Sequence, residues 1–300
     1  MTSTIHQTMF EGFRERQVQA GDARIFMRIG GEGPPLLLLH GFPQNHVMWH
    51  LVASRLAESF SVVMPDLRGY GDSLGPPPDP DHRNYSKRVM AADMIAVMSA
   101  LGHQRFLLAG HDRGGRVAYR LALDHPERVS RLAVLDILPT VDVWERMNSE
   151  AALRSYHWLL LAQPAPLPEC LIAHDSDFYL RHLLDRWAGR PDALDPAAVV
   201  EYARHFRKPS VIEAMCEDYR AGATVDRRDD RADRQNGRRL SCPTLVLWGT
   251  GYLAQKAGSP LDVWRPWAED VREVPLACGH FLAEEQPEAC AEALQAFFAR

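Results

Sequence analysis

Short apolar runs alternate with longer helix-like stretches over the first part of the chain, and this alternation restricts the fold more than any other feature. The predicted strands are 24–29, 36–39, 61–64, 105–109 and 131–135, and the helix-like stretches between them are 47–60, 86–101 and 116–124. Short runs that are apolar throughout are typical of strands buried on both faces of a sheet. Strands alternating with helices form parallel sheets with right-handed crossovers, so we expect an α/β fold.

The pattern changes after Pro139. Residues from about 140 to 235 form helix-like stretches rich in Trp and Tyr, for example 143–161, 177–187 and 196–206, without a convincing strand. Strand-like runs return at 243–248 and 270–274, and 286–298 has the pattern of a closing helix. We therefore expect an α/β core formed by residues 1–138 and 239–300, interrupted by a helical cap of residues 139–238.

The overall composition is that of a globular protein and excludes several functional classes. The 300 residues are 46% hydrophobic and 24% charged, with a formal net charge of −5, which gives no electrostatic footprint for nucleic acid or an anionic membrane. Segment 226–239 mixes arginines with aspartates. Because its signs alternate, a solvated helix or linker is favoured there over a nucleic-acid surface.

The pattern of cysteines and the lack of a recognisable targeting signal predict a cytoplasmic protein. The 5 cysteines are scattered without CxxC spacing, which argues against a disulfide framework and fits a reducing compartment. Neither HExxH nor paired Cys/His spacing occurs, so no metal site is predicted. Residues 1–7 lack the features of a signal peptide, and no apolar run approaches the ~20 residues of a membrane span.

The sharpest local motif is Gly110-His-Asp-Arg-Gly-Gly115, which follows a predicted buried strand and opens a helix. This is the strand–turn–helix arrangement of G-x-S-x-G, with Asp112 in the place of Ser. Small residues at 110 and 114 let the chain turn tightly and hold residue 112 in a strained conformation. Asp112 could instead cap the helix, but a cap alone does not require glycine on both sides. We predict that Asp112 is a nucleophile.

Two further residues complete a catalytic set in the chain order that this motif demands. His280 follows the last predicted strand, where the catalytic base is expected. The strand ending at Trp248 is followed by no carboxylate until Asp262, whereas Asp136 directly ends the strand after the Asp112 helix. We therefore assign the acid to Asp136, with a strand-end turn residue as the alternative role.

An oxyanion hole is expected opposite Asp112. The segment Leu39-His-Gly-Phe-Pro43 follows an early strand. A backbone N–H from this segment, which contains Phe42, would combine there with the N–H of Arg113.

Together these motifs resemble the α/β-hydrolase superfamily over essentially the whole chain. The residues that carry the resemblance are His40-Gly-Phe-Pro43, Asp66-Leu-Arg-Gly-Tyr-Gly-Asp-Ser73, Gly110–Gly115 and Gly279-His280. More narrowly, the chain resembles the aspartate-nucleophile branch, which contains haloalkane dehalogenases, epoxide hydrolases and haloacetate dehalogenases. The resemblance implies a mostly parallel sheet with an inserted helical cap, no cofactor, and a homodimer.

Five residues match the pattern of the fluoroacetate dehalogenases: Arg113, Arg116, His157, Trp158 and Tyr219. In that family two arginines bind the substrate carboxylate, and the His, Trp and Tyr surround the departing fluoride. Haloalkane dehalogenases typically carry Trp where this chain has Arg113. Epoxide hydrolases use a pair of cap tyrosines, an option kept open by Tyr156, Tyr179, Tyr202 and Tyr219.

Charge considerations agree with the resemblance. Arg113 and Arg116 lie three residues apart, on adjacent faces of one helix. Two guanidiniums beside one carboxylate would leave a net charge of +1 in a sheltered cleft, which favours binding of a small anion. Arg116 could instead pair with a structural acid elsewhere. His157 and Trp158 lie in an apolar helix-like stretch, where a core role is the alternative.

The sequence thus predicts hydrolysis of a small haloacid, such as fluoroacetate or another haloacetate, to glycolate and halide through an aspartyl ester. Water is the second substrate, and no cofactor, metal, nucleic acid or membrane is expected. The rival enzymes are an epoxide hydrolase and a dehalogenase of other 2-haloacids. The rival outside catalysis is a protein that binds small carboxylates on the same fold.

Overall fold

A computed structural model describes residues 9–190, 192–253 and 259–299, so the expectation for residues 1–7 concerns residues outside these ranges. The described strands form one 8-stranded sheet in the order β1-β2-β4-β3-β5-β6-β7-β8. β1 and β4 pair with β2 in antiparallel fashion, and all other pairs are parallel. The strands are β1 (Arg14–Ala20), β2 (Ala23–Gly30), β3 (Pro35–Leu39), β4 (Ser61–Pro65), β5 (Phe106–His111), β6 (Val129–Leu135), β7 (Thr244–Gly249) and β8 (Val271–Leu276). The predicted α/β fold is confirmed.

Each strand predicted from an apolar run is present, whereas β1 is not predicted. β1 has the sequence RERQVQA and is mostly exposed. It lies at the edge of the sheet and pairs only with β2. A polar edge strand carries no continuous apolar run, so the signal used for the buried strands is missing there.

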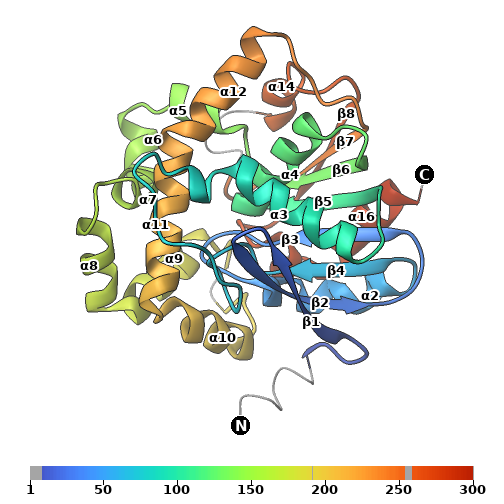
Figure 1. The fold of residues 1–300 in the computed structure, drawn as a ribbon, viewed down its shortest axis with the longest axis horizontal. Helices are drawn as coiled ribbons and strands as arrows, with labels where there is room; N and C mark the ends of the chain where they lie inside the picture. Colours follow the sequence, from blue (N-terminus) through green and yellow to red (C-terminus); the bar gives the residue numbers. More distant parts are fainter. Residues whose placement is uncertain (1–8, 191, 254–258, 300) are drawn as a thin grey trace.

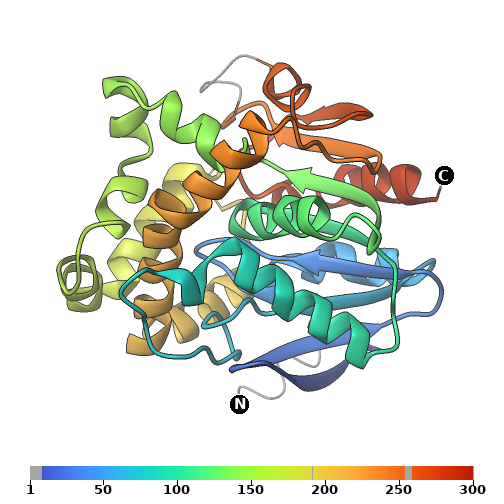
Figure 2. The same ribbon diagram turned by 45° about the horizontal axis from the view of Figure 1, so that its top comes forward.

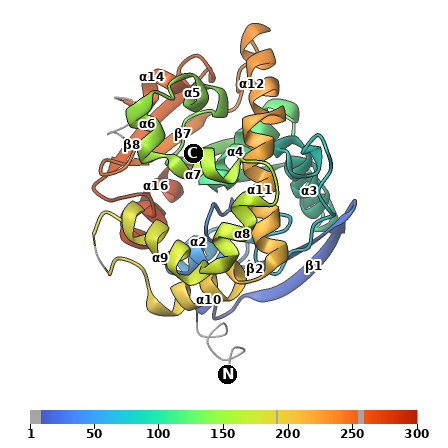
Figure 3. The same cartoon turned by 90° about the vertical axis from the view of Figure 1, so that its left-hand side faces the viewer.

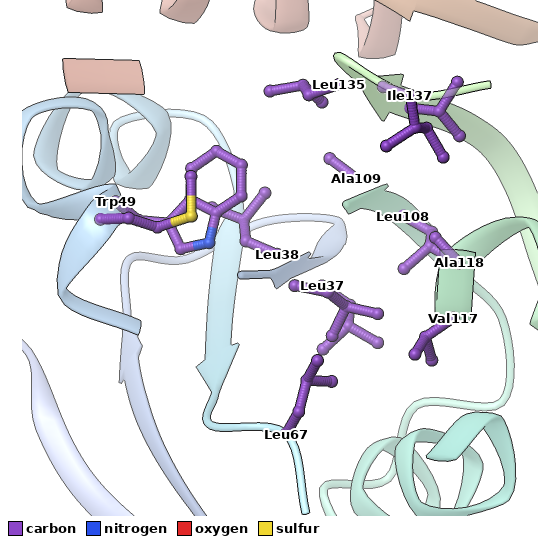
Figure 4. Close-up of a cluster of buried hydrophobic side chains, with 14 of the residues drawn as sticks. Leu37, Leu38, Trp49, Leu67, Leu108, Ala109, Val117, Ala118, Leu135 and Ile137 are labelled. Carbon is purple, nitrogen blue, oxygen red and sulfur yellow. The ribbon is translucent and has the colours of Figure 1, made fainter. Parts of the chain in front are cut away.

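Helices cover both faces of the sheet (Figures 1 and 2). α3 and α4 lie on one face, and α2 and α16 lie on the other. Figure 4 shows Val117 and Ala118 of α4 beside Leu108 of β5, with Trp49 near Leu38 on the opposite side. The bounds are η1 (His46–Trp49), α2 (His50–Ala57), η2 (Arg83–Tyr85), α3 (Lys87–Ala100), α4 (Asp112–Asp124), α14 (Pro260–Trp264), α15 (Leu282–Glu285) and α16 (Pro287–Phe298).

The segment between β6 and β7 is helical and covers the carboxyl ends of the strands (Figure 3). The single stretch predicted at 143–161 forms three short helices, because Asn148 caps α6 through the Ala151 N–H and the chain turns again at Ser155. The domain boundaries at 138 and 238 remain predictions. The helices are α5 (Thr140–Glu145), α6 (Ser149–Arg154), α7 (Tyr156–Leu161), α8 (Leu167–His174), α9 (Ser176–Trp187), α10 (Pro196–Phe206), α11 (Pro209–Ala223) and α12 (Val225–Gln235).

The arginine- and aspartate-rich segment forms α12, but the expectation of a solvated helix or linker is wrong for one of its faces. Asp226, Asp230 and Asp233 are buried. Asp230 Oδ1 accepts a hydrogen bond of 2.8 Å from Arg120 of α4, and Asp226 Oδ1 accepts one of 2.8 Å from the backbone N–H of Lys87. The alternating charges therefore join α12 to the core helices α3 and α4.

Two kinds of feature are absent from the part of the chain that the structure describes. None of its helices is both long and apolar enough to cross a membrane. No group of three or more His, Cys, Asp or Glu side chains there could hold a metal ion.

Candidate active site

Asp112 lies at the sharp turn from β5 into α4, at the carboxyl end of the sheet. Its φ of +45° is in the left-handed region that non-glycine residues rarely adopt. The flanking glycines are required by close backbone approach: a Cβ at Gly114 would collide with the carbonyl oxygen of His40, and one at Gly110 with that of Gly114. This geometry is strained, and strain of this kind clusters at active sites.

The two oxygens of the Asp112 carboxylate differ in their surroundings. Oδ1 accepts a hydrogen bond of 3.0 Å from the backbone N–H of Phe42. Oδ2 lies 3.9 Å from Nε2 of His280 and accepts no hydrogen bond from the described residues. Burial by itself would raise the pKa of Asp112, but the charges of His280 and Arg116 outweigh it and hold that pKa below its usual value. Asp112 is therefore ionised at neutral pH, with one oxygen available.

His280 and Asp136 are brought together next to Asp112. Nδ1 of His280 lies 2.5 Å from Oδ2 of Asp136, whose Oδ1 accepts the N–H of Gly249 at 2.9 Å. The backbone N–H of His280 donates to the carbonyl of Trp187 at 2.9 Å. The Asp136 contact orients the imidazole so that its other nitrogen faces Asp112. The structure therefore assembles the three residues predicted as the catalytic set.

A small cavity of about 60 Å³ opens beside these residues. Side chains from the sheet edge form one side, and side chains from α5, α6, α7 and α9 form the other. The predicted residues that line it are Asp112, Arg116, Asp136, His157, Trp158 and His280. The lining residues that were not predicted are Ile137, Leu138, Val143, Arg146, Met147, Ala151, Ser155, Trp187, Tyr252 and Leu253.

Arg116 lies in the cavity wall without a carboxylate partner among the described residues. Its Nη1 donates to the carbonyl of Leu138 at 2.9 Å and to Oγ1 of Thr140 at 3.1 Å. Its guanidinium carbon lies 4.5 Å from the centre of the Trp158 ring. Its Nε is buried and has no hydrogen-bond partner in the described ranges. Among the described residues no structural acid pairs with Arg116, so the structure gives no support to that alternative.

The charge prediction is wrong for Arg113. Its Nε and Nη2 donate to the two carboxylate oxygens of Asp218 at 2.9 and 2.6 Å, and both side chains are completely buried. Lys87 contacts the same carboxylate. The Arg113 charge is thus compensated by Asp218 of α11. The spacing of Arg113 and Arg116 in the sequence contains no information about this partner. Its Nη1 keeps no hydrogen-bond partner among the described residues.

His157, Trp158 and Tyr219 form one aromatic cluster. The ring centre of Tyr219 lies 5.8 Å from those of both His157 and Trp158, and Phe42 stacks parallel to His157 at 6.3 Å. Tyr219 and Phe42 are not among the cavity-lining residues found in the described part of the chain, and both are buried behind them. The Tyr219 hydroxyl is buried without a hydrogen-bond partner there. Burial, with the charge of Asp112 nearby, raises its pKa well above the usual value, so it keeps its proton to donate.

Three neighbours of the site were missed by sequence reasoning: Trp187, Asp218 and Tyr252. Trp187 ends a predicted helix and contacts His280, with ring centres 5.5 Å apart. Tyr252 lies 4.5 Å from His280 by the same measure. Asp218 precedes Tyr219, and only this adjacency could have drawn attention to it. None of the three belongs to a local motif, so each depends on long-range packing.

Comparison with known proteins agrees with this geometry. Residues 34–287 match the family model of the alpha/beta hydrolase fold. The chain is 46% identical to a fluoroacetate dehalogenase of Burkholderia sp, over 96% of this chain and 95% of that protein. It is 32% identical to a soluble epoxide hydrolase of Corynebacterium sp. (strain C12), over 99% and 97% of the two chains.

A crystal structure of an alpha/beta hydrolase from Nostoc sp PCC 7120 has a TM-score of 0.94 and 50% identity to this chain. It matches over 96% of this chain and 98% of its own length. The fold, the site and these full-length similarities together show that this chain belongs to the α/β-hydrolase family and is a hydrolase.

Proposed function

We propose that this hydrolase removes halide from a small haloacid, such as fluoroacetate or chloroacetate, and forms glycolate through an aspartyl ester. The observation that carries the proposal is the pairing of two groups in one small cavity. Asp112 presents a carboxylate oxygen without a hydrogen bond, and Arg116 presents a guanidinium without a carboxylate partner among the described residues. The first group suits nucleophilic attack, and the second favours an anionic substrate.

In the first step, Oδ2 of Asp112 attacks the carbon that bears the halogen. The new C–O bond forms as the carbon–halogen bond breaks, and the halide leaves with the electron pair. Arg116 holds the substrate carboxylate so that the reacting atoms lie ~3–3.5 Å apart. Arg113 does not line the cavity, but its Nη1 has no hydrogen-bond partner among the described residues and is the atom left for a weaker contact with the substrate, because Nε and Nη2 are bound to Asp218. His157 and Trp158, which line the cavity, donate to the departing halide, and the unpartnered hydroxyl of Tyr219 behind them is the third donor of this proposal.

In the second step, Nε2 of His280 takes a proton from water, and the resulting hydroxide adds to Cγ of Asp112. The oxyanion forms on Oδ1, where the Phe42 N–H already donates. The intermediate collapses by breaking the bond between Cγ and Oδ2, and Oδ2 takes the proton from His280 and leaves as the hydroxyl oxygen of glycolate. Asp136 stabilises the transient imidazolium. Asp112 is left as a carboxylic acid that carries one oxygen from water, and loss of its proton to solvent restores the carboxylate.

A substrate panel separates this proposal from its rivals. We expect chloride or fluoride release from chloroacetate and fluoroacetate, with glycolate formed in equal amount. Epoxide turnover without halide release would instead assign the chain to the epoxide hydrolases, one of which is 32% identical. Thermal stabilisation by acetate with no turnover of any substrate would identify a carboxylate-binding protein.

His280→Asn tests the two-step route directly. Asparagine cannot accept the proton of water, so the second step stops while the first proceeds. We expect mass spectrometry to detect a covalent adduct on Asp112 after chloroacetate is added. An unmodified Asp112, in a variant shown to bind substrate, contradicts the ester intermediate.

The homodimer and the cytoplasmic location also remain proposals. Both rest on the family resemblance and on cysteine usage. Light scattering coupled to gel filtration tests the first, and fractionation of source cells tests the second.

A further inference from the structure

One buried carboxylate holds both sides of the loop that carries His280. Glu285 lies in α15 and is 5% exposed. Its Oε2 accepts the backbone N–H of Gly279 at 3.0 Å, and its Oε1 accepts that of Phe281 at 3.0 Å. These two donors belong to the residues immediately before and after His280.

The same carboxylate reaches the segment that follows α9. Oε2 of Glu285 also accepts the N–H of Gly189 at 2.8 Å. Two residues earlier, the carbonyl of Trp187 accepts the N–H of His280 at 2.9 Å. The two segments are in direct backbone contact, because a Cβ at Gly279 would collide with the nitrogen of Gly189. Glu285 therefore joins the His280 loop to the end of the helix that supplies Trp187 to the cavity wall.

We propose that Glu285 is a positioning residue for His280, fixing its loop so that Nε2 faces the water that attacks the Asp112 ester. The inference rests on the proposed function, since it assigns Glu285 to one step of that reaction. A carboxylate offers two acceptor oxygens to the three N–H groups, whereas a glutamine amide offers only one oxygen and adds donors. His280 acts only in the second step, so loss of Glu285 slows ester hydrolysis and spares ester formation.

The chain offers a matched control next door. Glu284 is equally buried but points to other partners: its Oε1 accepts the hydroxyl of Tyr202 at 2.8 Å, and its Oε2 accepts Nε2 of Gln44. Burial raises the pKa of Glu284 to about 8. At pH 7 its carboxyl group is protonated and, like an amide, carries a donor beside its carbonyl oxygen, so glutamine imitates it closely. E284Q therefore controls for changing a buried acid in α15.

Rapid-quench kinetics with chloroacetate at pH 7 separate the two steps. For E285Q we expect a burst of chloride at the wild-type rate, then a steady-state rate lower by about 10- to 100-fold, with ester accumulating on Asp112. E284Q is expected to behave as wild type. The proposal is overturned if E285Q slows both steps equally or if E284Q gives the same pattern. If E285Q fails to fold, Glu285→Asp keeps the charge on a shorter side chain, and the same step-specific slowing is expected.

A measurement without substrate distinguishes failure of this inference from failure of the proposed function. The proton between Nδ1 of His280 and Asp136 is followed by proton NMR as pH is varied. We expect its chemical shift to change in E285Q and to be retained in E284Q. Identical spectra for E285Q and wild type overturn the positioning role. A wild-type enzyme that releases no halide removes the proposed reaction but leaves this comparison valid.

Discussion

The carboxyl end of the sheet and the helices that cover it meet at one cavity, but they are built in different ways. Asp112 and Asp136 directly follow β5 and β6, and His280 follows β8 within a few residues. Their positions are set by the sheet, whose hydrogen bonds leave little freedom at the strand ends. Trp158 and Tyr219 belong to α7 and α11, and they meet only because these helices pack over the core. Short motifs thus determine the first region, and long-range packing determines the second.

The two arginines of α4 show the same difference within one helix. Arg116 faces the cavity and forms no ion pair with a carboxylate of the described residues. Arg113, three residues earlier, faces α11 and forms a fully buried pair with Asp218. Their residue types and spacing are what the resemblance led us to expect, yet only the packing of α11 decides which guanidinium is compensated.

The largest effect is expected for a residue at the carboxyl end of a strand, Asp112. Asp112→Asn removes the nucleophilic charge while keeping the shape of the side chain, so we expect halide release from chloroacetate to fall by more than about 1,000-fold. A halide-selective electrode measures it, and circular dichroism checks the fold. Substantial activity in a protein confirmed by sequencing would mean that Asp112 is not the nucleophile.

The next two predictions distinguish the arginines: replacing Arg116 is expected to lower activity, whereas replacing Arg113 is expected to lower stability. For Arg116→Gln we expect kcat/KM for chloroacetate to fall by about 100-fold, because a charge-assisted contact contributes about 1.5–3 kcal/mol. Neutral chloroacetamide is the comparison substrate, and its turnover should change far less. Equal losses on both substrates would show that Arg116 is structural.

Arg113→Gln is expected to act mainly on stability. It leaves Asp218 buried and partly uncompensated, which costs about 3–5 kcal/mol in the free energy of unfolding. Urea denaturation measures this loss, and the double variant Arg113→Gln/Asp218→Asn should recover part of it. A fully stable single variant would contradict the importance of the pair.

A smaller effect is expected for Tyr219, which belongs to the helices that cover the sheet. Tyr219→Phe removes one buried hydroxyl and leaves the ring contacts with His157 and Trp158 in place. We expect the rate with fluoroacetate to fall by about 10-fold, and the rate with chloroacetate by less, since fluoride depends most on donors as its charge develops. The ratio of the two rates is the measurement. An unchanged ratio would place Tyr219 in the core alone.

The smallest effect concerns a contact between the two regions, the bond from Tyr202 of α10 to Glu284 of α15. Burial raises the pKa of Glu284 from 4.5 to about 8 in the folded protein. The folded state then binds this proton more tightly than the unfolded state, so the stabilisation is complete below pH 4.5 and is lost as pH rises to about 8. We expect the Tm of wild type relative to E284Q to fall between pH 5 and 8. Parallel Tm curves would contradict the raised pKa.

The sequence alone predicted the features that depend on local chemistry. Apolar runs in the sequence predict the buried strands. The glycines around Asp112 predict a tight turn, and the structure leaves no room for a Cβ at those positions. Because parallel strand ends meet at one edge of the sheet, Asp112, Asp136 and His280 could be grouped before any coordinates were known. The polar edge strand β1 was not predicted, because it carries no apolar run.

Only the tertiary structure decided which buried charges form pairs and which side chains hold the loops in place. Asp218 meets Arg113 across more than a hundred residues of chain, and Glu285 reaches back to the backbone on both sides of His280. α12 is a further case, since its aspartates face the core helices rather than water. Residue type and spacing show which charges a segment carries, but the partner of a buried charge depends on which helices pack against it.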